Sequence, residues 1–519
     1  MTVQLDDSVE FKSLPSGLHN VAEDLVYFAH GDEDMGISAF INRPSPTSQR
    51  NALTLAVGAL TRAKSWMHAQ ALKELAQRVS SDPTITQPLE QFWHAHGLQT
   101  QDSPDIAVEE SPSIRKSQDE SLNLPKRGRA VSSASAIGHP DTALPIHHPA
   151  RSLPQFLDTF GPLIFPLYKA ALLRKRILFL HHAPVETACN FVYDLALLSG
   201  IPSSAINLLP LDPLPTRIHT LFSVGIHDMP VLAGGARPRT PATDEGYGWV
   251  ACSTDNILLQ KHDLYDYIVD IRGCLEPQAD KRTWPRIVDS RGREIKATQR
   301  DLRRFQTLSN SLGSLDEGQG KTIFALDAGP ELVEPQSWSA VVYNGFMFWA
   351  GAGENRTDVE EEEEHDAALL RHLDAPKSPD QAQCNVKSPD MNDRSAGGPL
   401  EMQMTTIAFF HRLTTLILQT LADIVDSADD GSLDGVSELS NEHAEDRVGM
   451  QNESDPLLPP NDEEDETKIV VEPDDMVRMG LDTWSAGDRS FIRELLSFYW
   501  GRDSVVKRGS VECCGVRIC

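Results

Sequence analysis

The stretch that most constrains the fold is residues 168–200, YKAALLRKRILFLHHAPVETACNFVYDLALLSG. Its segment ILFLH at 177–181 is a short, continuous apolar run, which is typical of a strand buried on both faces. Apolar residues recur at helical spacing after Pro184, and Gly200 suits the residue that follows a helix. The cations at 174–176 lie where a preceding helix ends, and positive charge there complements the helix dipole. We therefore predict a helix, a strand and a second helix at the centre of an α/β domain.

The composition argues against two other interpretations of this stretch, a membrane segment and a nucleic-acid surface. The chain of 519 residues has 76 acidic and 47 basic side chains, and its net charge of −29 repels phosphate backbones and anionic lipid. No apolar run reaches the roughly 18 residues that a membrane helix needs, so we predict no integral membrane segment. The N-terminal sequence MTVQLDDSVEFK lacks the apolar core of a secretory signal, and the seven scattered cysteines favour a reduced compartment. We therefore predict a cytoplasmic protein with no nucleic-acid partner.

Residues 1–98 are predicted to form a small α/β lobe. The segments EDLVYFAH and ISAFIN alternate in the manner of strands on either side of GDEDMG, which indicates a hairpin. A helix is predicted to follow, because the apolar residues of WMHAQALKELAQRV recur at helical spacing: Trp66, Ala69, Leu72, Leu75 and Ala76.

The central block, residues 151–352, is predicted to be the larger α/β lobe. Besides the helix–strand–helix unit, we predict a hairpin at 248–260, a helix at 262–271 and a strand region with a tight turn at 338–351. A further helix of this lobe is predicted at 401–425, where apolar residues line one helical face. Residues 476–519 are predicted to be a C-terminal segment with two short helices.

Three polar segments separate these blocks and are predicted to be disordered: 99–150, 353–400 and 426–475. Their composition buries too little apolar surface to offset the entropy of ordering the chain. The acidic run DVEEEEEHD at 358–366 is predicted to be extended, because its like charges repel. Two short motifs in these segments are interpreted as solvated chain: KRGR at 126–129, similar to a nuclear address, and ESDPLLP at 453–459, similar to a dileucine sorting signal.

The residues that could carry chemistry do not form a catalytic constellation. Residues 318–322 resemble part of a phosphate-binding loop, but Leu315 stands where that motif requires glycine, and the following TIFALD favours a strand. His181 and His182 are adjacent on a strand, so they point to opposite faces and do not share a metal. The remaining candidates are interpreted as ordinary thiols and as carboxylates on the solvated faces of helices: Cys513, Cys514, Glu186, Asp194 and Asp270. We predict no catalytic residue, no cofactor and no metal.

Several of these segments resemble one family. The sequences at 160–180, 184–202 and 248–270 resemble the central part of DENN-domain proteins, in particular an LCHN-like branch in its fungal form. EFKSLPSGLHNVAEDLVYF at 10–28 and ISAFINRP at 37–44 resemble the N-terminal lobe of that branch. The sequence at 474–502 resembles a domain of unknown function that is appended in fungal members. The chain departs from the family at two places: only eight residues precede VEFKSLPSG, where relatives have a further strand, and the stretch around VGALTRAKSW is shortened. From the first departure, we expect either a trimmed N-terminus or an incomplete first lobe.

The resemblance implies a bilobal DENN module, in which a longin-like N-terminal lobe precedes a larger α/β DENN lobe, with long disordered insertions. Many DENN proteins release GDP from Rab-family small GTPases in membrane traffic, so the resemblance implies guanine nucleotide exchange without covalent catalysis. The implied partners are a Rab-family GTPase and trafficking adaptors, and the implied location includes the periphery of vesicle or endosomal membranes. The alternative is a non-catalytic DENN-like scaffold. No motif assigns the residues that contact the GTPase.

Overall fold

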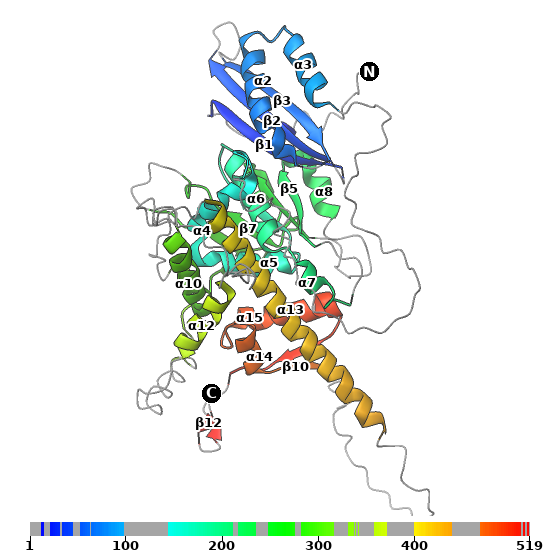
Figure 1. Ribbon diagram of the computed structural model, residues 1–519, viewed down its shortest axis with the longest axis vertical. Coiled ribbons are helices and arrows are strands. Elements are labelled where there is room, and N and C mark those ends of the chain that lie inside the picture. Colours follow the sequence, from blue (N-terminus) through cyan, green and yellow to red (C-terminus); the bar gives the residue numbers. More distant parts are fainter. Residues whose placement is uncertain are drawn as a thin grey trace, which may run out of the picture.

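The computed structural model describes the following residues: 12–14, 21–31, 34–44, 52–62, 64–97, 144–210, 216–234, 248–275, 282–315, 331–336, 338, 341, 358–370, 399–437, 468–509, 512–513 and 516–517. Within them, nine strands form one mixed sheet in the order β3-β2-β1-β5-β6-β4-β7-β8-β9 (Figure 1). Helices pack against this sheet, so the predicted α/β class is confirmed.

The elements of the N-terminal lobe are β1 (Glu23–His30), β2 (Asp34–Pro44), β3 (Ala52–Thr61), α2 (Ala69–Ser81) and α3 (Gln87–His96). The predicted hairpin is confirmed, because β1 and β2 pair antiparallel from Glu23↔Ile41 to His30↔Asp34. The predicted helix is α2, which buries Leu72, Leu75 and Ala76 against the sheet. β3 was not predicted. It extends the hairpin antiparallel to β2 and includes VGALT.

The strands of the central lobe are β4 (Ile177–Leu180), β5 (His219–Ser223), β6 (Trp249–Ser253), β7 (Tyr267–Asp270), β8 (Arg286–Asp289) and β9 (Glu294–Ile295). Its helices up to residue 315 are α4 (Leu153–Phe160), α5 (Ile164–Leu172), α6 (Glu186–Leu198), α7 (Ser203–Ile206), α8 (Met229–Gly234), α9 (Asn256–Leu259) and α10 (Gln299–Leu315). The predicted helix–strand–helix unit is confirmed as α5, β4 and α6, and β4 is buried along its whole length.

Two predictions for the central lobe are wrong. β6 pairs parallel with both β4 and β5, so no sheet edge is left for the second strand of a hairpin at 248–260. The residues after β6 form the single-turn helix α9 instead. The helix predicted at 262–271 is not formed: 262–266 form turns, and Tyr267–Asp270 form β7, which pairs with β4 and β8. A short apolar run does not distinguish a buried strand from a helix, and here the pairing partner decides.

The two faces of the sheet carry separate apolar cores. The larger core continues from the N-terminal lobe into the central lobe and includes Leu25, Tyr27, Leu72, Val192 and Phe222. The smaller core lies on the opposite face, where α8 and α9 bury Leu232 and Leu258. α6 packs against β1, β5 and β6, so it covers the point where the two lobes meet (Figure 1).

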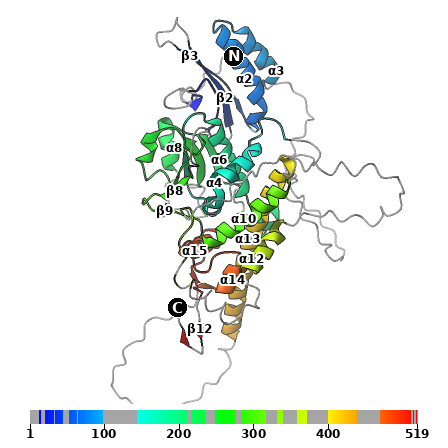
Figure 2. The ribbon, with the colours of Figure 1, turned by 90° about the vertical axis from the view of Figure 1, so that its left-hand side faces the viewer.

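The C-terminal half of the chain adds α12 (Asp358–Leu370), α13 (Pro399–Ser437), β10 (Ile469–Val471), α14 (Pro473–Arg478), α15 (Ala486–Trp500) and β11 (Ser504–Val506), followed by the strand pair β12 (Glu512–Cys513) and β13 (Val516–Arg517). α13 crosses the molecule as one long helix (Figures 1 and 2). Within the part of the chain that the structure describes, no helix is long and apolar enough to cross a membrane.

These C-terminal elements pack into the same body as α5. The ring of Phe410 on α13 stacks on Phe165, with their centroids 5.6 Å apart. The hydroxyls of Tyr168 and Thr414 lie 2.7 Å apart, and the Tyr499 hydroxyl of α15 donates to the Leu172 carbonyl at 2.8 Å. The helix predicted at 401–425 and the two short C-terminal helices are therefore confirmed, and they complete the central lobe.

Parts of the three segments predicted to be disordered are folded. Leu144 and Ala150 are buried in the main core, so the central lobe begins before residue 151. The acidic run lies in α12, α13 continues to Ser437, and β10 begins at Ile469. Other predictions concern residues outside the described ones: the motifs at 126–129 and 453–459, residues 318–322 and, apart from 338 and 341, the strand region at 338–351. The remaining domain boundaries stay predictions.

Candidate functional site

The two lobes meet along a narrow strand contact. β1 pairs antiparallel with β5 through Phe28↔Phe222 alone, and the register of β5 on β6 shifts between Thr220 and Phe222. Phe222 has φ of 56°, a left-handed conformation that is uncommon for a residue with a side chain. Because the strand contact is so short, the orientation of the lobes depends on other contacts around it.

Asp24, the second residue of β1, provides one of these contacts. Its carboxylate accepts hydrogen bonds from the backbone amides of Val185 at 2.7 Å and Glu186 at 3.2 Å, and so it satisfies the N-terminus of α6. A third amide, that of Leu25, donates to it at 2.8 Å. Burial raises the pKa of Asp24 to about 6, although the three amides and the helix terminus favour the charged form. One side chain of the N-terminal lobe therefore fixes the helix that covers the junction.

Glu186 extends the junction toward the surface. The Lys73 ammonium on α2 lies 3.3 Å from its carboxylate, and both side chains are about one third exposed. His147 Nδ1 lies 3.9 Å from the same carboxylate, and His147 Nε2 lies 3.0 Å from the Gln70 amide oxygen on α2. Glu186 was predicted to lie on a solvated face, but it connects α6 to the N-terminal lobe.

The carboxyl ends of the parallel strands carry the other predicted candidates. His181, which follows β4, is buried, and burial lowers its pKa to about 4, so the ring is neutral at physiological pH. His182 is exposed, as expected for the opposite face. Asp270 ends β7 and binds the Arg272 guanidinium through both oxygens, at 2.8 and 2.5 Å. Arg272 also donates to the Asn256 amide oxygen at 2.7 Å. These pairs fasten the loops after β6 and β7 to each other.

Asp194 was predicted to be solvated and is instead fully buried in α6. Its carboxylate accepts a hydrogen bond of 2.5 Å from the Ser152 hydroxyl, and burial raises its pKa well above the usual value for aspartate. The prediction was wrong because Ser152 comes from a segment that packs on α6 only in the folded chain. The two candidate thiols, Cys513 and Cys514, stay untested, since the structure describes no side chain there.

A buried ionic cluster joins the central lobe to its C-terminal elements. The Lys169 ammonium of α5 lies 3.0 Å from Asp301 of α10 and 2.6 Å from Asp488 of α15. Burial raises the pKa of Asp488, and the neighbouring ammonium opposes that rise. Sequence patterns did not identify these three charges. The only local signal is the presence of Lys169 inside an otherwise apolar helix.

A second ionic cluster explains why the acidic run is helical. Asp366 accepts hydrogen bonds from Arg300 at 2.6 and 2.8 Å and from Arg304 at 3.1 Å. Glu362 binds Arg303 at 2.6 and 3.0 Å. Burial by itself would raise the pKa of Asp366, but the guanidinium groups of Arg304 and Arg300 hold it well below its usual range. The arginines of α10 neutralise the repulsion on which the prediction of an extended chain depended.

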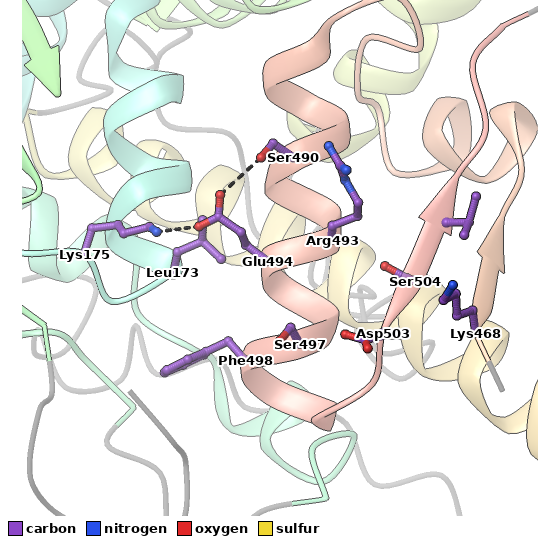
Figure 3. A pocket seen from close by; sticks show the side chains of 11 residues that line it. Leu173, Lys175, Lys468, Ser490, Arg493, Glu494, Ser497, Phe498, Asp503 and Ser504 are labelled. Carbon is purple, nitrogen blue, oxygen red and sulfur yellow. Dashed lines mark hydrogen bonds and ion pairs between the residues drawn. The ribbon is translucent and has the colours of Figure 1, made fainter. Parts of the chain in front are cut away.

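A groove lies between α15 and β11 (Figure 3). It has a volume of about 670 Å³ and is lined from α15, from β11 and its approach, and from the chain after α5. Lys175 is ion-paired with Glu494, and the Ser490 hydroxyl donates to the same carboxylate at 3.2 Å. Among the described residues, no three His, Cys, Asp or Glu side chains are arranged to hold a metal ion.

Comparison with known proteins extends these observations. Residues 1–279 match the family model of DENN domain-containing protein 11, and residues 333–519 match a domain of unknown function, DUF4484. DENN domain-containing protein 11 of Xenopus laevis is 30% identical over 302 residues, which are 55% of this chain and 61% of the relative. The Danio rerio protein of the same name is 28% identical over 279 residues, 51% of this chain and 48% of the relative.

A fungal protein matches over a longer range. The uncharacterized protein ANR2 of Saccharomyces cerevisiae is 22% identical over 528 residues, which cover 98% of this chain and 88% of that protein. The chain thus spans 61% of the Xenopus relative and 48% of the Danio relative, but most of the yeast relative. The resemblance noted in the sequence is confirmed: this chain belongs to the family of DENN domain-containing protein 11 and carries a DUF4484 domain toward its C-terminus.

Proposed function

We propose that this protein is a guanine nucleotide exchange factor that releases GDP from a Rab-family GTPase. The observation that carries the proposal is the family match over residues 1–279, which includes both lobes as far as β7. DENN-domain proteins generally act on Rab GTPases. Trafficking adaptors as further partners, and a location at the periphery of vesicle or endosomal membranes, belong to the same proposal.

Nucleotide exchange of this kind depends on binding energy and needs no covalent catalysis by the exchange factor. The factor accelerates release if it binds the nucleotide-free GTPase more tightly than the GDP-bound form, and a thousandfold difference in affinity corresponds to about 4 kcal/mol. The described residues supply a surface that is held in one shape before binding. Asp24, the Lys73–Glu186 pair and the shared apolar core join the two lobes, so little ordering entropy is lost when a partner contacts both.

The test is release of fluorescent GDP from a panel of purified Rab GTPases, in excess GTP and millimolar Mg²⁺, with catalytic amounts of the full chain. We expect at least roughly tenfold acceleration for one Rab or a small group, and none for a Ras-family GTPase as the matched control. The variant Asp24→Ala reports on the junction: it is expected to reduce exchange while the chain remains folded, because the N-terminus of α6 loses its acceptor.

The alternative is a scaffold that binds partners without exchange. The net charge of −29 favours the scaffold, because an acidic chain attracts basic segments of other proteins. The same panel separates the two functions. Capture of a nucleotide-free Rab without accelerated release would favour the scaffold, and failure of every Rab both to bind and to exchange would contradict the proposed function.

A further inference from the structure

In the part of the chain that the structure describes, the small sheet beside the groove has only two strands, so one edge of β11 is unpaired. β10 and β11 are parallel, and Ile469 N donates to Asp503 O while Lys507 N donates to Val471 O, both at 2.9 Å. In a parallel ladder this pattern turns the peptide groups of Ser504 and Val506 away from β10. Among the described residues, these outward N–H and C=O groups have no hydrogen-bond partner. A two-stranded sheet is marginal by itself, and an unpaired strand edge is a template for pairing with a further strand.

The groove lies along this free edge. Its lining includes Ser504 and Val505 from β11 and Arg493 and Ser497 from α15, and β10 lies on the other side of β11 (Figure 3). Asp503 and Lys468, which directly precede β11 and β10, also line it. Val505 is 45% exposed and Val470, its neighbour in register, is 43% exposed, so the outer face of the sheet is apolar. The hydroxyl of Ser504 is buried without a partner in the described part of the chain. An extended chain in the groove could therefore use both backbone hydrogen bonds and apolar contacts.

The charged side chains that line the groove are three cations, Lys175, Lys468 and Arg493, and two carboxylates, Glu494 and Asp503, so positive charge is in excess. The Glu494 carboxylate is already neutralised by Lys175, so it does not oppose an anion. Arg493 is exposed, and its one hydrogen bond among the described residues is to its own helix, from Nε to the Arg489 carbonyl at 3.4 Å. Burial lowers the pKa of Arg489, and the positive charges of Arg508 and Arg493 lower it further, whereas the carboxylates of Asp482 and Asp488 act in the opposite direction.

We propose that the groove between α15 and β11 binds an extended acidic peptide of a partner protein. The peptide adds a strand to the free edge of β11, and one of its carboxylates pairs with Arg493. The two elements that would hold the peptide, α15 and β11, lie in the DUF4484 match, so the proposal gives this domain a role in recruitment that does not depend on nucleotide exchange.

The test is a fluorescence anisotropy titration of the full chain, without any GTPase, into a labelled octapeptide of alternating Val and Glu. The same peptide with Lys in place of Glu is the charge control. The acidic peptide is expected to bind and the basic one to bind at least roughly tenfold more weakly, because each charge-assisted hydrogen bond is worth about a factor of ten. Arg493→Glu is expected to produce a loss of the same size.

Two proline variants test the strand pairing. Ser504→Pro removes an N–H on the free edge of β11 and is expected to abolish binding. Val470→Pro is the matched control, since its N–H points to the opposite edge of the sheet, and it is expected to leave the affinity within about twofold. Circular dichroism reports whether each variant is folded. Arg493→Glu changes an exposed side chain, so it keeps the test decisive if a proline variant does not fold.

Two results would overturn the proposal. One is equal binding of the acidic and basic peptides, or binding that is insensitive to Arg493→Glu. The other concerns the acidic sequence NDEEDET at 461–467, which directly precedes Lys468 at the groove. If its deletion is required before the acidic peptide binds, the groove is the site of an internal segment and not of a partner. None of these results depends on exchange activity.

Discussion

Asp366→Asn tests whether buried arginines hold the acidic helix α12 in place. The substitution keeps the shape of the side chain and removes a charge that is paired with Arg300 and Arg304, both nearly inaccessible to solvent. Loss of one partner from a buried ion pair costs about 3–5 kcal/mol, because the remaining charges stay buried without compensation. We expect the free energy of unfolding to fall by ~3 kcal/mol at pH 7. Glu363→Gln, an exposed change on the same helix, serves as the control and should leave stability unchanged.

The pH dependence provides an independent check. The pKa of Asp366 is lowered in the folded chain, whereas it is about 3.9 in an unfolded one. A lowered folded pKa stabilises the fold above the unfolded pKa, and this contribution is lost as the pH falls toward the folded value. The difference between wild type and Asp366→Asn in urea unfolding should therefore be constant from about pH 7 to 5 and shrink below about pH 4. Equal stability of Asp366→Asn and Glu363→Gln at pH 7 would refute the reasoning.

Three further predictions concern the junction and the two halves of the chain. Because burial raises the pKa of Asp24 to about 6, its contribution to stability is full below about pH 4 and should decline by ~3 kcal/mol as the pH rises from about 4 through 6. Asp24→Asn should lack this decline in urea titrations, and parallel pH profiles would contradict the assignment. Lys73→Ala should lower the free energy of unfolding by no more than ~1 kcal/mol, since its pair with Glu186 is partly exposed; a loss above ~2 kcal/mol would show that the junction is less solvated than described. A chain that ends at residue 279 lacks α13 and α15, so Phe165 and Tyr168 of α5 lose the side chains of α13 that contact them. This shortened chain should aggregate, or should unfold without a cooperative transition in calorimetry. A soluble fragment with a sharp transition would contradict this prediction.

The boundary between the two family matches falls inside one folded body. The DENN match ends at residue 279 and the DUF4484 match begins at 333, yet α15 of the second contacts α5 of the first through Tyr499 and through Lys169–Asp488. The C-terminal elements are therefore structural components of the central lobe, in addition to any role in recruitment.

Local signals in the sequence were sufficient to predict the elements whose partners are close in the chain or that are buried along their whole length. The alternation of β1 and β2 around a polar turn specified the hairpin, and the apolar run of β4 between two helical patterns specified the centre of the larger lobe. The helix at α13 could be predicted because its apolar spacing persists over many turns.

The tertiary structure decided the features that depend on distant partners. β7 has the composition of either a helix or a strand, and its place between β4 and β8 selects the strand. The acidic run would repel itself in isolation, and the arginines of α10, some sixty residues away, make it a helix. Asp24 looks like an ordinary surface charge in the sequence, and Lys169 is marked only by its position in an apolar helix. Only folding brings the amide of Glu186 on α6 to Asp24 and the carboxylates of α10 and α15 to Lys169. Periodicity within a segment reports which face is buried, whereas pairing and charge compensation require groups that the segment does not contain.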